Sequence, residues 1–550
     1  MIMGRNDLEV NGGAFMNTRK ADVVIIGGGL GGTLAAWTLA NRGLEVIMTE
    51  ETDWIGGQLT SQAVPPDEHP WIEQTGCTAA YRAFRNQIRS YYAALVKPEL
   101  LQDRDAYDNT FNPGNGWVSR LCHEPNVAHD LLQAWLCPHV EEGRLHILYH
   151  TVPLEAHTQG DAVQDTTVLN RITGEKTVLT GQYYVDATEC GDVLPLAGVE
   201  YIVGAESQQM TGEPHALTEA DPADLQAFTV VMSLEKLDAN AAERNEPIAK
   251  PASYDWWRSF HHEGSPYPLL SWWDTKPNAT HELRKFICLP DGIDPLPLWT
   301  YRRTVDASQF RDGHYEGDLS LINWPQNDYS IASPVEMSYE ERDAVVEEAK
   351  QLSLSLLYWL QTEAPREDGR VGYPEFRLYR PSVGTDDGLA KSAYIRESRR
   401  IHALYTITEH DVSKELRKGQ GLGIRRYEDS VGVGHYSMDL HTTTKTGRSC
   451  YIPTLPYEIP LGSLIPKRVT NVLPACKNIG TTQLTNGCYR LHPTEWNIGE
   501  SVGHLIAYSI EQGVIPRKVY EDKHHLSAYQ AELDGAGVQR SWPFDGTEIV

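Results

Sequence analysis

The hydrophobic positions near the start of the chain follow the order strand, helix, strand. Residues 22–26 are a short β-branched run, typical of a buried parallel strand. After a glycine-rich turn, apolar residues recur at helical spacing from Leu30, and Gly43 predicts the end of that helix. Residues 45–48 predict a second strand that ends near Glu50. This order predicts a β-α-β unit of a parallel sheet.

The same patterning predicts further elements along the chain. Helical spacing of apolar residues predicts helices over 79–96, 126–140 and 493–512, and Ser338 and Glu341 form a capping box that opens another helix. Three short runs predict a small antiparallel meander with a turn at 160–161, and two apolar runs predict buried strands. The meander runs are 145–149, 166–169 and 176–179, and the buried strands lie in 183–192, where the strand ends in small and acidic residues, and in 469–475.

The turn after the first strand carries the motif G-x-G-x-x-G. Gly27 permits a tight turn, Gly29 lets backbone approach a pyrophosphate, and Gly32 lets the helix pack on the strand. Leu30 and Gly31 lie within the same loop and first helical turn, where we also expect ligand contacts. Glycines, strand, helix and second strand in this order predict a dinucleotide site, whereas a lone motif of this kind is weak.

Two further segments extend the predicted dinucleotide site. Glu50 stands where an acid accepts hydrogen bonds from a ribose 2′-hydroxyl and repels a 2′-phosphate. Gly56, Gly57 and Gln58 follow the second strand, and adjacent glycines let main chain lie flat against a large ligand. An ordinary turn is the alternative interpretation of these glycines.

The length, charge and cysteine content of the chain limit the classes of protein to which it can belong. The 550 residues suffice for two or three domains, and the formal net charge of −27 argues against nucleic acid or an anionic membrane as a partner. Eight cysteines without C-x-x-C predict free thiols in a reducing compartment, and no apolar run reaches the length of a membrane span. We therefore expect a cytoplasmic protein, with residues 1–20 as a flexible tail.

Residues 183–192 end a buried strand with small and acidic residues. This stretch resembles the Asp-Ala-Thr-Gly motif of two-dinucleotide-fold flavoproteins, and the whole chain resembles the FAD-dependent oxidoreductase family, which is distantly related to the fumarate reductase/succinate dehydrogenase flavoprotein. Thr188 matches the motif, whereas Glu189 and Cys190 depart from the usual Gly-Asp.

The resemblance implies an α/β fold with FAD as the cofactor. It implies a Rossmann-like FAD-binding domain of glutathione-reductase type with an inserted α+β substrate domain. The expected division is 21–212 for the first part of the FAD domain, 213–450 for the substrate domain, 451–520 for the return segment and 521–550 for a C-terminal extension. The tryptophan-rich middle part suits an aromatic-lined concave face, or ordinary core.

The return segment carries the remaining cofactor candidates. In the resembled family, the helix of this segment directs its N-terminus at the pyrimidine edge of the flavin, so Asn497, Ile498 and Gly499 are expected there. A helix N-terminus at that edge stabilises the negative charge of a reduced flavin. The resemblance also implies contacts from Gly480 and Val152. Helix packing at Gly499 and Gly503 is the alternative.

Two groups of polar side chains are candidates for the chemistry. Arg396 and Arg399 stand in a basic cluster where, at helical spacing, they share a face that could bind a carboxylate, although salt bridges are the plainer interpretation. His435 and His441 would line one face of a strand over 434–441, and His492 precedes the last helix. Any one of these histidines could take a proton, or serve only as a hydrogen-bonded structural group.

The expected reaction is hydride transfer from a small organic substrate to flavin N5. A second G-x-G-x-x-G with strand and helix is absent from the sequence, so electrons are expected to leave to oxygen, a quinone or a partner protein. The adjacent pairs 261–262 and 524–525 lack the spacing of a helical zinc site, and no metal is expected. The alternatives are a monooxygenase fed by a separate reductase, an NAD-dependent dehydrogenase without flavin, and a flavin held only as a binding module.

Overall fold

The computed structural model describes residues 17–101, 110–238, 242, 245–274, 285–290 and 297–547. Its central element is a five-stranded parallel sheet in the order β21-β8-β2-β3-β4. Its strands are β2 (Val23–Ile26), β3 (Val46–Thr49), β4 (Leu145–Leu148), β8 (Tyr183–Asp186) and β21 (Val472–Pro474). Every residue of β2, β3 and β8 is buried, as expected for strands covered on both faces. The fold is therefore mixed α/β with a parallel sheet.

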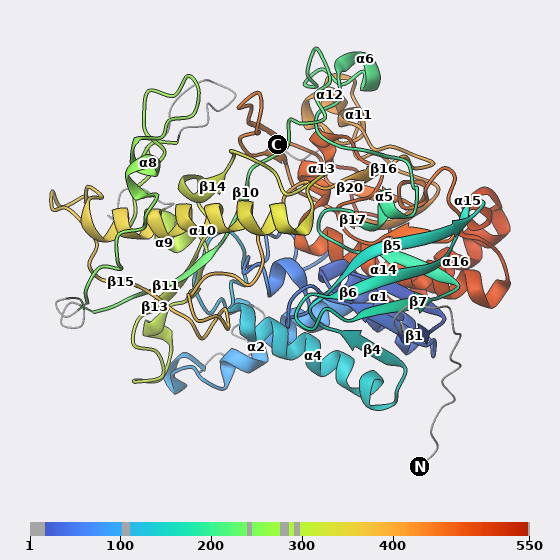
Figure 1. Cartoon of the computed structure of the whole chain (residues 1–550), viewed down its shortest axis with the longest axis horizontal. Helices are drawn as coiled ribbons and strands as arrows, with labels where there is room; N and C mark the ends of the chain where they lie inside the picture. Colours follow the sequence, from blue (N-terminus) through green and yellow to red (C-terminus); the bar gives the residue numbers. More distant parts are fainter. Residues whose placement is uncertain are drawn as a thin grey trace.

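The two ends of the chain meet on this sheet. Helix α1 (Leu30–Asn41) follows β2, and helix α14 (His492–Gln512) packs directly against it, so the first and last parts of the sequence lie side by side (Figure 1). A Cβ atom on Gly499 would lie 2.3 Å from the carbonyl oxygen of Gly31. The helices approach so closely that only glycine fits at this crossing.

The helices α2 (Ala79–Ala93) and α4 (Pro125–Glu141) confirm the two helices expected there. The meander prediction was wrong for its first strand, because β4 joins the parallel sheet beside β3 and continues the β-α-β pattern. The antiparallel part consists of β5 (Thr151–Gln159), β6 (Ala162–Asn170) and β7 (Lys176–Thr180).

The predicted N-terminal tail is only partly within the described residues. Residues 17–20, expected in a flexible tail, form β1 (Asn17–Lys20), which pairs in parallel with β7. Residues 1–16 of that prediction lie outside the described residues. Backbone hydrogen bonds to β7 hold β1 in place although all four of its residues are exposed.

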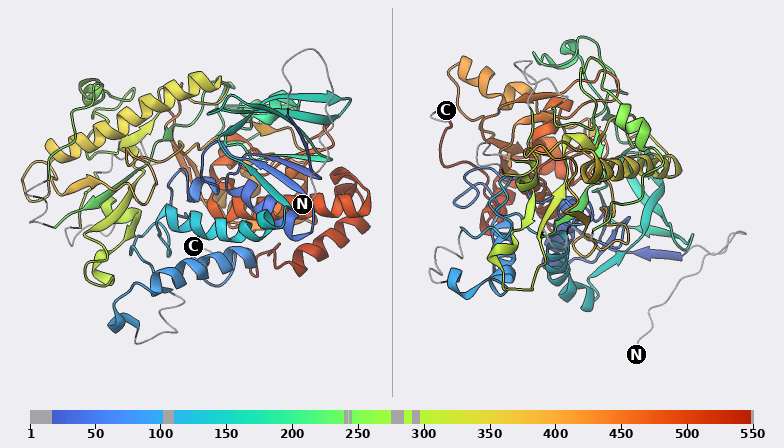
Figure 2. Two further views of the ribbon diagram at one scale, coloured as in Figure 1. Left: turned by 60° about the horizontal axis from the view of Figure 1, so that its bottom comes forward. Right: turned by 90° about the vertical axis from the view of Figure 1, so that its left-hand side faces the viewer.

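The middle of the chain builds a second body around an antiparallel sheet. This sheet has the order β12-β13-β11-β15 and carries the long helix α10 (Tyr339–Thr362), as the left-hand part of Figure 1 and both views of Figure 2 show. Its strands are β11 (Met232–Lys236), β12 (Arg303–Val305), β13 (Asp318–Ile322) and β15 (Phe376–Leu378). The capping box predicted at Ser338 and Glu341 opens α10.

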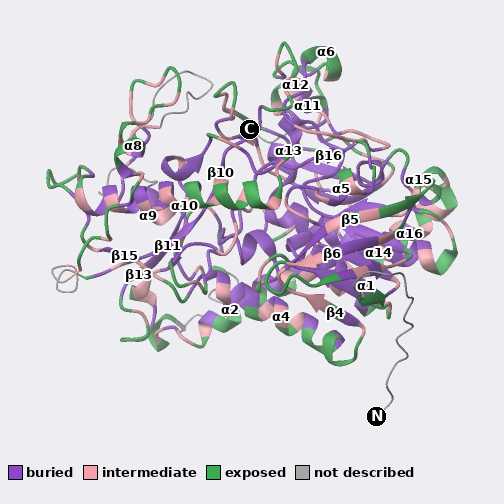
Figure 3. Cartoon of the chain, in the orientation of Figure 1, coloured by how far each residue is buried: buried purple, intermediate pink, exposed green. Residues whose placement is uncertain are grey.

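Most tryptophans of this body are core. Trp257, Trp272, Trp299 and Trp324 are buried in the cluster between α10 and the antiparallel sheet, whereas Trp256 is exposed. The interpretation as ordinary core is therefore correct for most of them. Figure 3 shows that buried residues are found in the interior of both bodies.

The segment from 395 to 460 returns the chain toward α14. Residues 395–399 are irregular, and β16 (Arg400–Ile401) pairs with β9 (Tyr201–Ile202), so the basic cluster is not helical as its spacing suggested. The single strand expected over 434–441 is also wrong, because β17 (Ser430–Gly434) ends before His435 and β18 (Met438–Leu440) starts a new pairing. Their partners are β20 (Tyr457–Pro460) and β19 (Cys450–Ile452).

Short elements complete the chain. The helices are α5 (Val193–Leu196), α6 (Gln208–Thr211), α8 (Tyr254–Ser259), α9 (Leu298–Tyr301), α11 (Glu409–Val412), α12 (Lys414–Gly419), α13 (Gln483–Tyr489), α15 (Pro516–Glu521) and α16 (Lys523–Gly535), and β10 (Phe228–Thr229) pairs with β14 (Asp328–Tyr329). All eight cysteines are free thiols. Within the described ranges, no helix has the length and apolar character needed to cross a membrane.

Candidate active site

A cavity of about 250 Å³ opens at the carboxyl ends of β2 and β8. We call it the glycine-loop cavity. The chain runs outward from β2 through β3 to β4 and then returns to β8 on the other side of β2. Such a reversal of strand order leaves a crevice at the carboxyl ends, which is where open α/β sheets bind ligands. Six predicted cofactor residues line it: Gly27, Gly29, Glu50, Gly57, Val152 and Thr188.

The glycine loop is pressed against the end of β8. Gly27 has a φ of +100°, and a Cβ there would lie 2.4 Å from the carbonyl oxygen of Ala187. A Cβ on Gly32 would lie 2.0 Å from the carbonyl oxygen of Gly27. The first glycine therefore makes the turn and the third allows the close helix-strand contact, which leaves Gly29 at the cavity wall.

Glu50 lies at the cavity wall with one carboxyl oxygen already occupied. Its Oε1 accepts hydrogen bonds from the backbone N and the Oγ1 of Thr52, both at 2.8 Å. Burial raises the pKa of Glu50 to about 7. A ligand hydroxyl donating to this carboxyl would offset part of its desolvation, as a ribose would.

Thr188 is held by a turn that follows β8. The Oδ1 of Asp186 accepts from the backbone N of Thr188 at 3.0 Å and from its Oγ1 at 2.7 Å. The same threonine oxygen accepts from the backbone N of Asp192 at 2.7 Å. This network fixes the position of Thr188 at the cavity wall.

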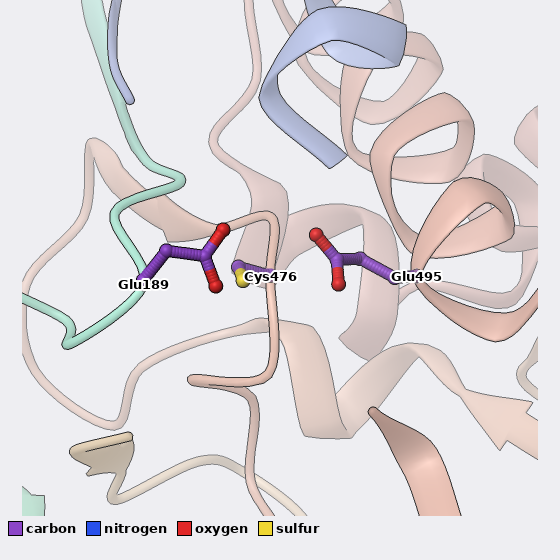
Figure 4. A group of neighbouring side chains, drawn as sticks. All are labelled: Glu189, Cys476 and Glu495. Atoms are coloured by element: carbon purple, nitrogen blue, oxygen red, sulfur yellow. The ribbon is translucent and has the colours of Figure 1, made fainter. Parts of the chain in front are cut away.

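A cluster of ionisable groups lies beside the glycine loop. Figure 4 shows the carboxylates of Glu189 and Glu495 on either side of Cys476, with ligand atoms all within 4.8 Å of one another. Three such groups could hold a metal ion, but the ammonium of Lys477 pairs with Glu189 and already supplies a positive charge. Burial raises the pKa of Glu495 to about 7.

Gln58 and Gly31 contact this cluster rather than the cavity. The backbone N of Gly31 donates to Glu495 Oε1 at 3.1 Å, and the Nε2 of Gln58 donates to Glu495 and to the carbonyl of Arg490. The Oε1 atoms of Gln58 and of the cavity-lining Gln62 are buried without a hydrogen-bond partner among the described residues. Of the two, Gln62 lines the cavity, so its Oε1 can receive a donor from a polar ligand.

Six other predicted cofactor residues do not line the cavity. Leu30 is core, Gly56 packs on Leu132, and Gly480 packs on Ala403. Asn497 accepts from the backbone of Val433, so it ties α14 to β17. Ile498 is buried in the core, and Gly499 faces α1. For the helix residues, the packing interpretation is therefore the one that the geometry supports.

A second cavity, of about 410 Å³, lies between the two bodies. We call it the tyrosine-arginine cavity. Its wall combines three guanidinium groups, several aromatic rings, three buried or half-buried carboxyl groups and one imidazole. These residues are Arg302, Arg396, Arg490, Tyr301, Tyr394, Tyr436, Trp117, Asp67, Asp274, Asp439 and His441. Polar groups concentrated in a concave, aromatic-walled cavity are typical of a small-molecule site.

His441 is oriented by carboxylates. Its Nδ1 lies 2.6 Å from Asp328 Oδ2, and its Nε2 lies 3.2 Å from Asp439 Oδ2. Both ring nitrogens therefore face carboxylate oxygens, and a hydrogen on Nδ1 toward Asp328 would leave Nε2 as the acceptor position of the ring. Asp328 also pairs with Arg396 at 2.9 Å, so one buried carboxylate positions two predicted catalytic residues.

The other predicted catalytic residues lie outside this cavity. Arg399 binds Glu336 at 2.6 Å and Asp192 at 3.0 Å, pointing away from Arg396 because the segment is extended and not helical. His435 packs edge-on against Trp71, and burial lowers its pKa to about 3. The salt-bridge interpretation fits Arg399, and a structural role fits His435.

His492 has a structural place as well. Its Nδ1 accepts from the backbone N of Asp67 at 3.1 Å, and its Nε2 bonds the carbonyl of Val64 at 3.1 Å. Burial holds its pKa well below the usual range. With both ring nitrogens used and the neutral form favoured, this imidazole has no free position for a substrate proton.

Several residues of the site carry no local signal in the sequence. Arg302, Tyr394 and Arg490 come from distant segments, and no motif links them. Tyr394 lies between two guanidinium groups: its hydroxyl accepts from Arg490 Nη1 at 2.6 Å, and Arg396 lies 4.9 Å from its ring centroid. Proximity to the predicted Arg396 was the one available hint.

The two cavities share a wall. Ser392, Ala393 and Ile395 line the glycine-loop cavity, whereas Tyr394 and Arg396 line the tyrosine-arginine cavity. Successive side chains of an extended segment point to opposite sides. One stretch of five residues therefore separates a nucleotide-type cavity from a polar, aromatic one.

The glycine loop, the acid at the end of β3 and the crevice beside β8 define a dinucleotide-binding α/β protein. A family described as FAD dependent oxidoreductase matches residues 22–533. The chain belongs to this family, is an FAD-dependent oxidoreductase, and has FAD as its cofactor. No curated protein sequence matches the chain.

Solved structures give weaker similarities. p-Nitrophenol 4-monooxygenase from Pseudomonas putida DLL-E4 aligns at 11% identity over 95% of both chains with a TM-score of 0.34. A geranylgeranyl bacteriochlorophyll reductase-like protein from Thermoplasma acidophilum aligns at 10% identity over 95% of this chain and 85% of its own, with a TM-score of 0.32. L-proline dehydrogenase from P. horikoshii aligns at 15% identity with a TM-score of 0.18, over 35% of this chain but only 25% of that protein. Likenesses at this level identify no substrate.

Proposed function

We propose that the chain oxidises a small organic substrate in the tyrosine-arginine cavity by hydride transfer to FAD bound in the glycine-loop cavity. The observation that carries this proposal is the wall of residues 392–396 that the two cavities share. A redox cofactor and its substrate must lie next to each other, and this wall is where the two cavities meet. When bound, FAD would supply a hydride acceptor at N5.

The residues of the first cavity suit the nucleotide half of FAD. Gly29 leaves backbone free to approach the pyrophosphate, and Glu50 would accept from the ribose hydroxyls. Val152 and Thr188 would complete the wall around this half, and Gln62 would offer its unpartnered Oε1 to a ligand donor.

The residues of the second cavity would move the proton that accompanies the hydride. His441 Nε2 would accept it from the tautomer that carries its hydrogen on Nδ1, where Asp328 lies 2.6 Å away. The imidazolium that forms would be stabilised by Asp328 and by Asp439 at 3.2 Å. Arg396, fixed by the same Asp328, would orient the substrate, and the buried wall would exclude water.

The proposal includes a division of the chain into an FAD-binding domain and a substrate domain. A glutathione-reductase-type FAD domain would consist of residues 21–212 and 451–520, with 213–450 as the inserted substrate domain and 521–550 as an extension. The adjacency of β21 and β8 in one sheet supports the split FAD domain, because the chain between them leaves and then rejoins that sheet.

An anaerobic substrate screen tests the proposed reaction. The FAD-loaded protein is mixed with candidate substrates without oxygen or a nicotinamide nucleotide, and the visible flavin absorption is followed. Bleaching by a substrate alone is the expected result. Persistence of the oxidised spectrum with every substrate, combined with reduction only by an added reductase, would instead indicate a monooxygenase.

A further inference from the structure

The tyrosine-arginine cavity holds three guanidinium groups that are almost fully buried. Arg302, Arg396 and Arg490 are 6%, 1% and 3% exposed. Guanidinium groups stay protonated in proteins, so the cavity contains three permanent positive charges. Charges this deeply buried require compensation by nearby anions.

The carboxylates around these arginines compensate them unequally. Arg396 has a close partner in Asp328 at 2.9 Å. Arg302 lies 3.5 Å from Asp67, and Arg490 lies 3.9 Å from Asp439. Charge-assisted hydrogen bonds are shorter, at about 2.7–2.9 Å. Two of the three guanidinium groups therefore lack a close carboxylate partner.

The unpartnered atoms of the cavity are mainly donors. The Nε atoms of Arg302, Arg396 and Arg490 and the Nδ2 of Asn323 are buried without a hydrogen-bond partner among the residues that the structure describes. Because buried polar groups are normally bonded, an orphaned set of donors around one cavity indicates a ligand that brings acceptors. Carboxylate oxygens are the acceptors that guanidinium groups match best.

Asp67 competes only weakly with such a ligand for the guanidinium groups. Burial raises its pKa, against the opposing effect of Arg302 and Arg490. The 3.5 Å between Asp67 and Arg302 is longer than a charge-assisted hydrogen bond, so a ligand carboxylate could bond Arg302 more closely than Asp67 does.

The mouth of the cavity is aromatic. Trp117, 38% exposed, packs on Tyr301 with ring centroids 4.2 Å apart, and the guanidinium of Arg302 lies 4.2 Å from the Tyr301 ring centroid. Trp117, Tyr301 and Arg302 therefore form a continuous stack from the surface to the guanidinium of Arg302. It suits a planar or ring-shaped group attached to the anion.

We propose that the tyrosine-arginine cavity binds an organic carboxylate, with the carboxylate between Arg302 and Arg490 and its ring directed toward Trp117. This inference rests on the proposed function, since the carboxylate would be the group by which the oxidised substrate is held. It names a chemical class, a ring-bearing carboxylic acid, for the substrate.

The test compares benzoate with benzamide, which has the same shape and no charge, by calorimetric titration of the FAD-loaded protein. We expect benzoate to bind at least about tenfold more tightly, and Arg490→Gln to weaken benzoate by about 10- to 100-fold while leaving benzamide unchanged. Arg490→Lys, which keeps the charge, should recover part of the affinity. Arg399→Lys, altered in the same basic cluster but outside the cavity, should bind benzoate like the parent protein.

The outcomes separate this inference from the proposed reaction. Equal binding of benzamide and benzoate, or an Arg490→Gln variant that keeps its bound FAD and its benzoate affinity, would overturn the carboxylate assignment. Arg490-dependent binding of benzoate without bleaching of the flavin by any carboxylic acid would keep the assignment and contradict the oxidation. Bleaching by neutral substrates alone would keep the oxidation and contradict the assignment.

Discussion

Replacing Gly29 by alanine perturbs the proposed FAD site while leaving the fold intact. Gly29 has a φ of −57°, so alanine adopts its backbone without strain. The new Cβ would lie 2.9 Å from Glu189 Oε1, the end of a flexible side chain, and 3.3 Å from the carbonyl oxygen of Ala187. The carboxylate of Glu189 can move aside, so we expect the protein to fold.

The substitution Gly29→Ala should instead weaken the binding of FAD. A methyl group at this wall would hold a phosphate oxygen away from the loop N–H groups and remove at least one hydrogen bond to a charged acceptor. Such a bond contributes about 1.5–3 kcal/mol, which corresponds to FAD binding about 10- to 150-fold weaker. Gly29→Val should weaken FAD further, because a larger side chain fills more of the pyrophosphate space.

Titration of the FAD-free protein with FAD, followed by the change in flavin fluorescence, measures this effect. Gly419→Ala is the matched control, because a Cβ at the exposed Gly419 meets no atom within 4 Å. Equal FAD affinities of Gly29→Ala, Gly419→Ala and the parent protein would refute the assignment of the glycine loop to the pyrophosphate.

Three further variants test other parts of the account. His441→Asn should slow substrate-dependent bleaching by about 10²- to 10⁴-fold with FAD still bound, and an unchanged rate in rapid mixing would exclude His441 as the proton acceptor. Gly499→Ala should destabilise the FAD-free protein by about 1–3 kcal/mol in denaturant unfolding, since its Cβ would lie 2.3 Å from the Gly31 carbonyl oxygen; a loss of FAD affinity without a loss of stability would favour a cofactor role instead. Burial raises the pKa of Glu500 from 4.5 to about 7. The folded state therefore holds this proton more tightly than the unfolded state, and the contribution to stability is complete below about pH 4.5 and lost as pH rises to about 7. Glu500→Gln should remove this decline in the free energy of unfolding, about 3.5 kcal/mol for a pKa that rises from 4.5 to about 7 at about 1.4 kcal/mol per pKa unit. An unfolding free energy with the same pH slope as the parent would disprove the raised pKa.

Local signals in the sequence were sufficient for the parts of the fold that neighbouring residues determine. The β2-α1-β3 unit follows from the β-branched run, the glycine turn and the helical spacing that ends at Gly43. Helix α10 follows from a capping box that satisfies its own backbone groups. In both cases the residues that specify the element are adjacent in the chain.

Other features of the fold and of the candidate site depend on contacts between residues far apart in the sequence, so they could not be predicted from local patterns. From the sequence, Gly499 could make room either for a cofactor or for a neighbouring helix. Only the position of α1 in the structure distinguishes these two roles. Arg396 and Arg399 share a face in a helix but point to opposite sides in the irregular segment that the chain adopts there. Arg302 and Arg490 reach the same cavity from distant segments, and their spacing in the sequence gives no sign that they lie close together.

A crystal structure of the chain grown with FAD tests the central claim most directly. We predict the adenosine diphosphate half of FAD in the glycine-loop cavity, with its pyrophosphate against Gly29 and its ribose at Glu50, and the flavin ring at the wall formed by residues 392–396. FAD bound elsewhere, or a flavin ring that points away from the tyrosine-arginine cavity, would contradict it.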